Sequence, residues 1–307
     1  MSAKAQLPKS GTLLSDISGF PKPALVKLEK LWITTVEELI GVTETNSGQK
    51  NLAQYLQLDE KALAKIIEII RPHLPRLDST DAKRLESAKS AAFNISGALA
   101  PSKALMRSRL KLEAYRATEH LATLPDSVDW RNSMTPIRNQ GQRGTCVAFS
   151  VVSLREFLVV RKEDGQEQCD LSEQFLYWAC KERDGYNGSG TWIHVAMRCL
   201  LEIGVCIESD WPYNPRPIQG NEGQGPPPND ALEHAHLFKT TSTININPRS
   251  TVDLKTCLAD GKVVAFAIPV FDSWYSSAAV RRYGNIPMPF PVTGHRRWNA
   301  DHSPHPA

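Results

Sequence analysis

A single cysteine marks the junction between a polar loop and a long apolar run, and this junction constrains the fold more than any other feature of the chain. The loop, residues 137–145, is rich in glycine and glutamine and ends directly before Cys146. Over residues 146–162 apolar side chains recur at close spacing, at Val147, Phe149, Val151, Val152, Leu154, Phe157 and Leu158. This pattern predicts a largely buried helix that begins at the cysteine.

The position of Cys146 in the first turn of this helix has a chemical consequence. The unpaired backbone N–H groups and the positive end of the helix dipole favour a thiolate, which is the nucleophilic form of cysteine. The same N–H groups can face an oxyanion, and Gln140 supplies a side-chain amide six residues before the cysteine. Together these groups predict nucleophilic catalysis with an oxyanion-stabilising site.

The segment 137–150 resembles the active-site segment of papain-like cysteine peptidases. Four further segments resemble that family in the same order along the chain: residues 124–131, 171–176, 184–191 and 204–213. The resemblance implies an α+β fold with a helical lobe followed by a β-rich lobe and a substrate cleft between them. It also implies hydrolysis of peptide bonds in a peptide or protein substrate, without a cofactor.

The resemblance assigns roles to six residues of this chain. Cys146 corresponds to the nucleophile, Gln140 to the oxyanion donor, and His295, which lies 149 residues after Cys146, to the base. Residues Gly188, Ser189 and Gly190 correspond to the loop that binds the substrate backbone, although a tight turn alone would also require glycine there. We expect His194, His234 and His236 to have surface or capping roles, and we assign no orienting amide to Asn299.

Two departures from the family pattern lie beside the nucleophile. Arg143 occupies the place of a half-cystine and Val147 that of an aromatic residue. We therefore expect Cys180, in the position of that disulfide's partner, to be a free thiol. The six cysteines form no dense framework and no Cys-x-x-Cys pair, so we expect reduced thiols, with Cys199–Cys206 or Cys169–Cys180 pairing only in an exported chain.

The last residues, 296–307, are short, polar and interrupted by proline. They are more typical of a truncated or out-of-frame terminus than of the strands that end the family's β-rich lobe, so we expect that lobe, within the peptidase domain 124–307, to be incomplete. An alternative function is then a non-catalytic interaction protein with a degenerate peptidase fold. A metal site at His295, His302 and His305 would have no preformed geometry, and we expect no metal.

The residues before the peptidase-like region fall into three parts. Residues 1–16 are expected to form a flexible tail, and residues 17–75 a small all-α domain with capping signals at Thr35 and Asp59. This domain resembles a degenerate helix-hairpin-helix module, and because residues 32–35 replace the hairpin glycines that would bind phosphate, we favour a protein partner over nucleic acid. Residues 76–123 are either a helical linker or an inhibitory pro-segment.

Hydropathy and composition set the remaining expectations. No window is apolar enough to span a bilayer and the N-terminus leads into no apolar signal core, so we expect a cytoplasmic protein without a membrane partner. In the C-terminal part we predict a Pro- and Gly-rich loop over 214–230, strands over 240–246 and 263–270, and a short helix over 252–259 that ends at Gly261.

Overall fold

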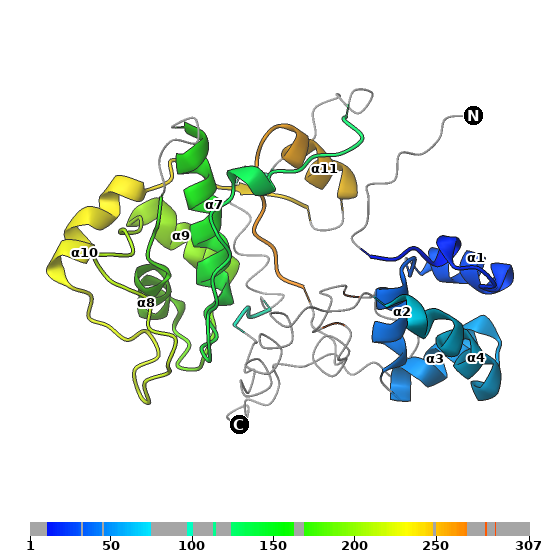
Figure 1. The fold of residues 1–307 in the computed structure, drawn as a ribbon. Coiled ribbons are helices and arrows are strands. Elements are labelled where there is room, and N and C mark those ends of the chain that lie inside the picture. Colours follow the sequence, from blue (N-terminus) through cyan, green and yellow to red (C-terminus); the bar gives the residue numbers. More distant parts are fainter. Residues whose placement is uncertain are drawn as a thin grey trace. The chain divides into compact units, whose positions relative to one another are not determined.

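The computed structural model describes residues 11–31, 33–44, 46–74, 97–100, 113–114, 124–162, 169–247, 250–268, 280 and 286. The predicted base His295 and the residues Asn299, His302 and His305 lie outside the described residues. The chain divides into two compact units, residues 1–90 with 268–307 and residues 91–267 (Figure 1). The four-part division expected from the sequence stays a prediction.

The described part of the first unit is a set of short helices around its own apolar core. Its elements are η1 (Leu14–Asp16), α1 (Lys22–Lys30), α2 (Val36–Thr43), α3 (Asn46–Leu56), α4 (Glu60–Ile70) and η2 (Arg71–His73). Each longer helix contributes a fully buried aliphatic side chain, namely Leu28, Leu39, Leu52 and Ile70. The helices expected between residues 24 and 70 are therefore confirmed.

Both helix starts that the sequence predicted in this unit carry side-chain caps. The Thr35 hydroxyl accepts a hydrogen bond from the Glu38 N–H at 3.2 Å, and the Glu38 carboxylate accepts one from the Thr35 N–H at 3.0 Å. At the start of α4, Asp59 accepts from the Ala62 N–H at 2.7 Å. These bonds satisfy backbone donors that have no partner inside the helix.

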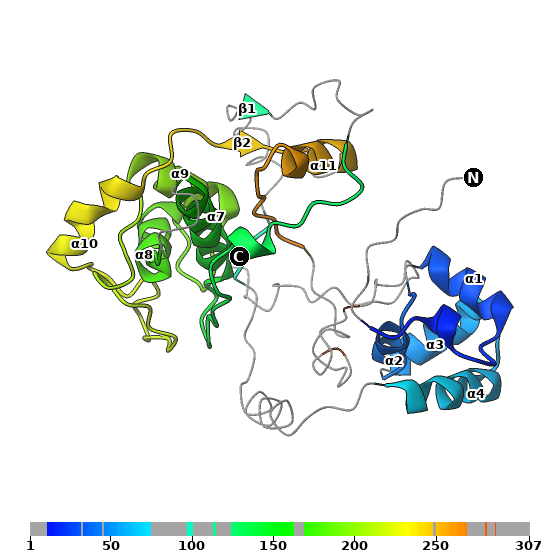
Figure 2. The ribbon, with the colours of Figure 1, turned by 45° about the horizontal axis from the view of Figure 1, so that its top comes forward.

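The second unit is built around three helices that pack together, α7 (Cys146–Lys162), α8 (Glu173–Asp184) and α9 (Ile193–Glu202) (Figures 1 and 2). Its other helical elements are η4 (Arg131–Ser133), α10 (Asn229–His234), η5 (Ala235–Phe238) and α11 (Thr251–Ala259). The core between the three helices includes Val151 and Val152 of α7, Phe175 of α8 and Leu200 of α9. The predicted helix beginning at Cys146 is confirmed at both ends.

The β-strands among the described residues form one parallel pair, β1 (Glu113–Ala114) with β2 (Ile244–Asn245). The predicted strand over 240–246 is therefore present only at residues 244 and 245. The strand predicted over 263–270 is wrong for 263–268, which form no strand and leave Phe266 66% and Ile268 52% exposed. Strand propensity needs a neighbouring strand to satisfy its backbone, and no described segment pairs with this run.

The loop predicted over 214–230 is free of helix and strand as far as residue 228, whereas residues 229 and 230 begin α10. The predicted helix α11 ends shortly before Gly261, whose φ of +76° suits glycine. In the part of the chain that the structure describes, no helix combines the length and apolarity needed to cross a membrane.

Candidate active site

The loop that precedes α7 turns sharply so that Cys146 can begin the helix. Gly141 has a φ of +65°, and a Cβ at this position would meet the Pro215 Cβ at 2.6 Å, so both the backbone and the available space require glycine. The Gln142 N–H donates to the Pro215 carbonyl at 3.1 Å. The loop is thereby fixed against the Pro- and Gly-rich segment that follows Tyr213.

Gln140 is held on both its side chain and its main chain. Its Nε2 donates to the Arg143 carbonyl at 2.7 Å, and its own carbonyl accepts from the Tyr213 hydroxyl at 2.8 Å. The same Tyr213 oxygen lies 2.6 Å from the Thr145 hydroxyl, directly before Cys146. A side-chain amide offers two donors, so one N–H of Gln140 is engaged and the second is left for another acceptor.

The thiol of Cys146 is half-buried, and this burial raises its pKa above the ordinary value. Backbone hydrogen bonds from Gly97, Val147 and Ala98 act in the opposite direction and lower the pKa, with burial the larger effect. The sequence predicted only the lowering at the helix start. The burial of the Cys146 thiol was not predicted, because it involves a segment that lies far upstream in the sequence.

That upstream segment, residues 97–100, pairs with Thr191 as a short parallel bridge. The Leu99 N–H donates to the Thr191 carbonyl at 2.9 Å, and the Thr191 N–H donates to the Gly97 carbonyl at 2.8 Å. Gly97 approaches so closely that a Cβ on it would meet the Gly144 carbonyl oxygen at 2.1 Å. A stretch of extended peptide backbone therefore lies against the helix start that carries the thiol.

The glycine loop predicted to bind substrate lies beside the same helix start. The Ser189 hydroxyl accepts from the Gly144 N–H at 3.2 Å, and the Gly190 N–H donates to the Tyr177 hydroxyl at 2.9 Å. Lys181 reaches into the loop and donates to the carbonyls of Gly188 and Gly190, each at 3.0 Å. Five of the six predicted site residues thus come together, and the sixth, His295, lies outside the described residues.

Arg143 is the feature of this site whose role sequence reasoning missed. It is 2% exposed, and its guanidinium donates to Gln174 and to the carbonyls of Asn214 and Glu222. All six cysteines are free thiols, as expected for Cys180, whose side chain hydrogen-bonds to that of Cys199. In the sequence, the only indication of this role was that Arg143 occupies a position where the family resemblance implied a half-cystine.

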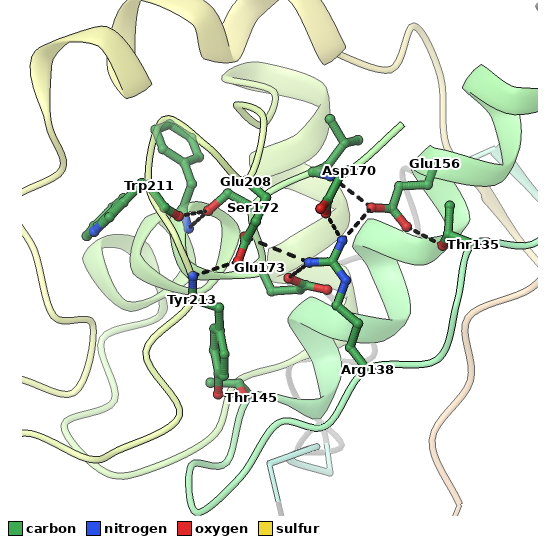
Figure 3. Close-up of polar contacts among 12 residues, drawn as sticks. Thr135, Arg138, Thr145, Glu156, Asp170, Ser172, Glu173, Glu208, Trp211 and Tyr213 are labelled. Carbon is green, nitrogen blue, oxygen red and sulfur yellow. Dashed lines mark hydrogen bonds and ion pairs between the residues drawn. The ribbon is translucent and has the colours of Figure 1, made fainter. Parts of the chain in front are cut away.

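A group of carboxylates surrounds Arg138, two residues before Gln140 (Figure 3). Its guanidinium lies 3.1 Å from Glu173, 3.5 Å from Glu156 and 3.9 Å from Glu208, and it also pairs with Asp170. Burial raises the pKa of Glu173 to about 7, the Arg138 charge opposes the rise, and Glu208 and Glu156 add to it. Burial also raises the pKa of Glu208.

Two of the three histidines set aside from the sequence have exposed partners. His234 pairs with Asp210 at 3.0 Å, an interaction that raises its pKa, and His236 contacts the Glu233 carbonyl at 2.6 Å. His194 lies beside Trp192, with ring centroids 6.2 Å apart. For the first two, the surface roles expected from the sequence agree with this placement.

Comparison with known proteins gives one consistent result. The profile of the family described as "Papain family cysteine protease" matches residues 124–285. Cysteine proteinase 1 of Entamoeba histolytica is 39% identical over 93 residues, which is 29% of this chain and 29% of that protein. Papain of Carica papaya is 26% identical over 194 residues, 59% of this chain and 53% of papain.

Among solved structures, the cysteine protease xylellain from Xylella fastidiosa superposes with a TM-score of 0.50 at 24% identity, over 65% of this chain and 75% of that one. At this identity the likeness concerns the fold. The chain spans only 29% and 36% of the length of the two Entamoeba cysteine proteinases that it resembles.

Proposed function

The chain belongs to the papain family of cysteine proteases, and from this premise we propose that it hydrolyses peptide bonds through the Cys146 thiolate. The observation that carries the proposal is the junction at the start of α7, where the half-buried thiol and the Gln140 amide are held by one loop. A nucleophile beside fixed N–H donors is the arrangement that acyl transfer requires.

The proposed reaction has two stages. The Cys146 sulfur attacks the substrate carbonyl carbon, and the resulting oxyanion accepts hydrogen bonds from the Cys146 N–H and from the second N–H of Gln140. The C–N bond then breaks as the leaving amine takes a proton from the base, for which His295 is our candidate. Water hydrolyses the thioester that remains and restores the thiol.

We infer that the substrate is an extended peptide held along the loop of Gly188, Ser189 and Gly190. The support is the backbone pairing between Thr191 and residues 97–99, since the same N–H and C=O groups suit any extended chain. Such main-chain pairing recognises a peptide without selecting its side chains. The substrate class is therefore peptide or protein.

The test is the rate of Cys146 alkylation by iodoacetamide between pH 4 and pH 9 in the wild type and in His295→Ala. A working thiolate–imidazolium pair gives labelling that persists well below the ordinary thiol pKa of about 8.5 and is lost in the variant. Cys146→Ala is the control for labelling of the five other cysteines, all of which are buried.

Labelling that rises only near the ordinary thiol pKa, unchanged in His295→Ala even when Gly97→Ala displaces residues 97–100, would contradict the catalytic proposal. It would favour the alternative function, a non-catalytic interaction protein with a peptidase fold. In that case the helical module over residues 17–75 would be the candidate binding part, and we propose a protein rather than a nucleic acid as its partner. Loss of a co-purifying protein on deletion of this module would test that assignment.

We also propose that residues 97–100, within the region 76–123 that the sequence suggested as inhibitory, cover Cys146 in a latent form of the enzyme. The support is the backbone hydrogen bonding of Gly97 and Ala98 to the thiol together with their pairing to Thr191. If opening of this segment precedes labelling, the alkylation rate will saturate as iodoacetamide is raised. A rate that matches that of Gly97→Ala at every iodoacetamide concentration would mean that the thiol is not covered.

The cysteines suggest where this enzyme works. Six free thiols, five of them buried, suit a reducing compartment, and we propose the cytoplasm. Imaging of the tagged full-length protein in its native cell, with a secreted and a cytosolic marker beside it, tests this location.

A further inference from the structure

Arg143 carries an inference that goes beyond the nucleophile and the oxyanion donors. Its side chain is the largest of the fully buried side chains among the described residues, and burial lowers its pKa. Arginine remains charged even when its pKa is lowered, so the chain keeps a cation out of water at this position. Such a group is costly unless its hydrogen bonds and its charge are compensated.

The compensation comes from three uncharged oxygens, two aromatic rings and the nearby Glu222 carboxylate, whose charge raises the pKa of Arg143. Nη1 donates to the Gln174 side-chain oxygen at 2.6 Å and to the Asn214 carbonyl at 2.8 Å, and Nη2 donates to the Glu222 carbonyl at 3.0 Å. The guanidinium carbon lies 5.2 Å from the ring centroids of both Tyr177 and Tyr213. A planar fork with several donors fits this set, whereas a lysine ammonium does not.

The same contacts reach both walls of the candidate site. On one side, the main-chain carbonyl of Arg143 accepts from Gln140, and Tyr213 donates to the Gln140 carbonyl at 2.8 Å. On the other side, the Tyr177 hydroxyl accepts from the Gly190 N–H at 2.9 Å. The two tyrosines beside the Arg143 guanidinium thus fix the loop that carries Gln140 and the loop that carries Gly190.

We propose that Arg143 is a positioning residue of the peptidase. Its buried guanidinium contacts the rings of Tyr177 and Tyr213 and thereby fixes Gln140 and the loop of Gly190 around Cys146. It does so at a position where the family has a disulfide. Arg143 does not touch the reacting atoms. It acts through the backbone that carries the oxyanion donors. This inference rests on the proposed peptidase function, because the effect of Arg143 on the site is measured through kcat as well as through amide hydrogen exchange of the loop.

The central test compares Arg143→Lys with the wild type in hydrolysis of a fluorogenic dipeptide amide. Misplacement of the oxyanion donors is expected to lower kcat by about 100-fold, because small displacements of catalytic groups have effects of that size. KM is expected to stay within about threefold, since Arg143 makes no substrate contact. In Arg143→Ala, millimolar guanidinium is expected to restore part of kcat by filling the vacated site.

The matched control is Arg155→Lys, the same substitution at a partly buried arginine of α7. The Arg155 Nε donates to the Phe238 carbonyl at 3.0 Å. This hydrogen bond does not involve the loop 137–145 that precedes Cys146. Its variant is expected to keep kcat within about threefold of the wild type. Equal losses in both variants would show general loosening of the helix and would overturn the positioning role.

Hydrogen exchange separates failure of this inference from failure of the proposed function. In the wild type, the Gln142 and Gly144 amides, bonded to Pro215 and Ser189, are expected to exchange slowly, and the Arg143→Lys substitution should speed their exchange. A wild type with this pattern that stays inactive when Gly97→Ala displaces residues 97–100 contradicts the peptidase function but supports positioning. An active wild type whose Arg143→Lys variant keeps both kcat and slow exchange overturns the inference.

Should the Arg143 variants fail to fold, Gln174→Ala provides the test. It removes the 2.6 Å acceptor while leaving the arginine and both tyrosines in place. Faster exchange at Gln142 and Gly144, together with a lower kcat, supports the inference. Unchanged exchange and unchanged kcat overturn it.

Discussion

At the scale of single residues, two glutamines in the loop before Cys146 have different surroundings. The Gln140 side chain donates to the Arg143 carbonyl, whereas the Gln142 side chain is exposed and its main-chain N–H donates to the Pro215 carbonyl. Gln140→Ala should lower kcat by about 100- to 1,000-fold with little change in KM, because an oxyanion donor acts mainly in the transition state. Steady-state hydrolysis of a fluorogenic peptide measures this loss.

Gln142→Ala is the matched control for that substitution. It makes the same chemical change two residues away and leaves the backbone bond to Pro215 intact. Its kcat is expected to remain within about threefold of the wild type. An equal loss in the two variants would mean that Gln140 contributes through loop stability and not through a hydrogen bond to the oxyanion.

Glu173 gives the residue-scale prediction for pH. Its side chain is 5% exposed and shares Arg138 with Glu156, Asp170 and Glu208, so ionisation adds negative charge to a buried group of carboxylates. Because the folded-state pKa of about 7 exceeds the unfolded value of 4.5, the native state binds the Glu173 proton more tightly. The contribution to stability is therefore complete below pH 4.5 and is lost as the pH rises to about 7.

The substitution Glu173→Gln should remove this dependence while keeping an oxygen that can accept from Arg138. Between pH 5 and pH 8 the wild type should lose up to about 3 kcal/mol more unfolding free energy than the variant. Urea unfolding followed by tryptophan fluorescence at both pH values measures the difference, with Glu182→Gln, exposed on α8, as the control. A variant that loses stability in parallel with the wild type would contradict this role of Glu173.

At the scale of elements, the helices whose signals are local could be predicted from the sequence. The α4 start is an example, because Asp59 and the Ala62 N–H that it accepts from lie within one turn. Asp59→Ala should lower the stability of α4 by about 1 kcal/mol, and Asp59→Asn by much less because the amide oxygen can still cap. Amide hydrogen exchange along α4 in the full chain measures both, and equal exchange in the two variants would contradict the cap.

Elements that depend on distant partners could not be predicted in the same way. The run 263–268 is β-prone, yet a strand also needs a neighbour, and the sequence does not say which segment supplies one. The residues that contact Arg143 are far apart in the sequence: Tyr177 belongs to α8, whereas Tyr213 and Glu222 flank the loop between them. No local sequence pattern indicates that these residues meet. That Gln140 and Cys146 belong to one loop and the helix start that follows it could be predicted, because the two residues are only six apart in the sequence.

At the scale of the whole molecule, the state of the thiol depends on a segment nearly fifty residues upstream in the chain. Residues 97–100 lie against the helix start that carries Cys146, burial raises the thiol pKa, and backbone hydrogen bonds from Gly97, Ala98 and the first residues of α7 lower it. On the proposal of a latent peptidase, the thiolate is favoured only once the covering peptide has left. The second unit would then both support catalysis and restrain it.

The closest point of this contact provides a direct test. A Cβ on Gly97 would lie 2.1 Å from the Gly144 carbonyl oxygen, which is backbone and cannot rotate away, so Gly97→Ala should displace residues 97–100 from the helix start. Exposure of Cys146 should then speed its alkylation at neutral pH, because iodoacetamide gains access to the sulfur and the burial that raises the thiol pKa is relieved. Ala100→Val enlarges an exposed residue of the same segment and should leave the rate unchanged. If Gly97→Ala labels no faster than Ala100→Val, the segment does not limit access to the thiol, and the latency must have another origin.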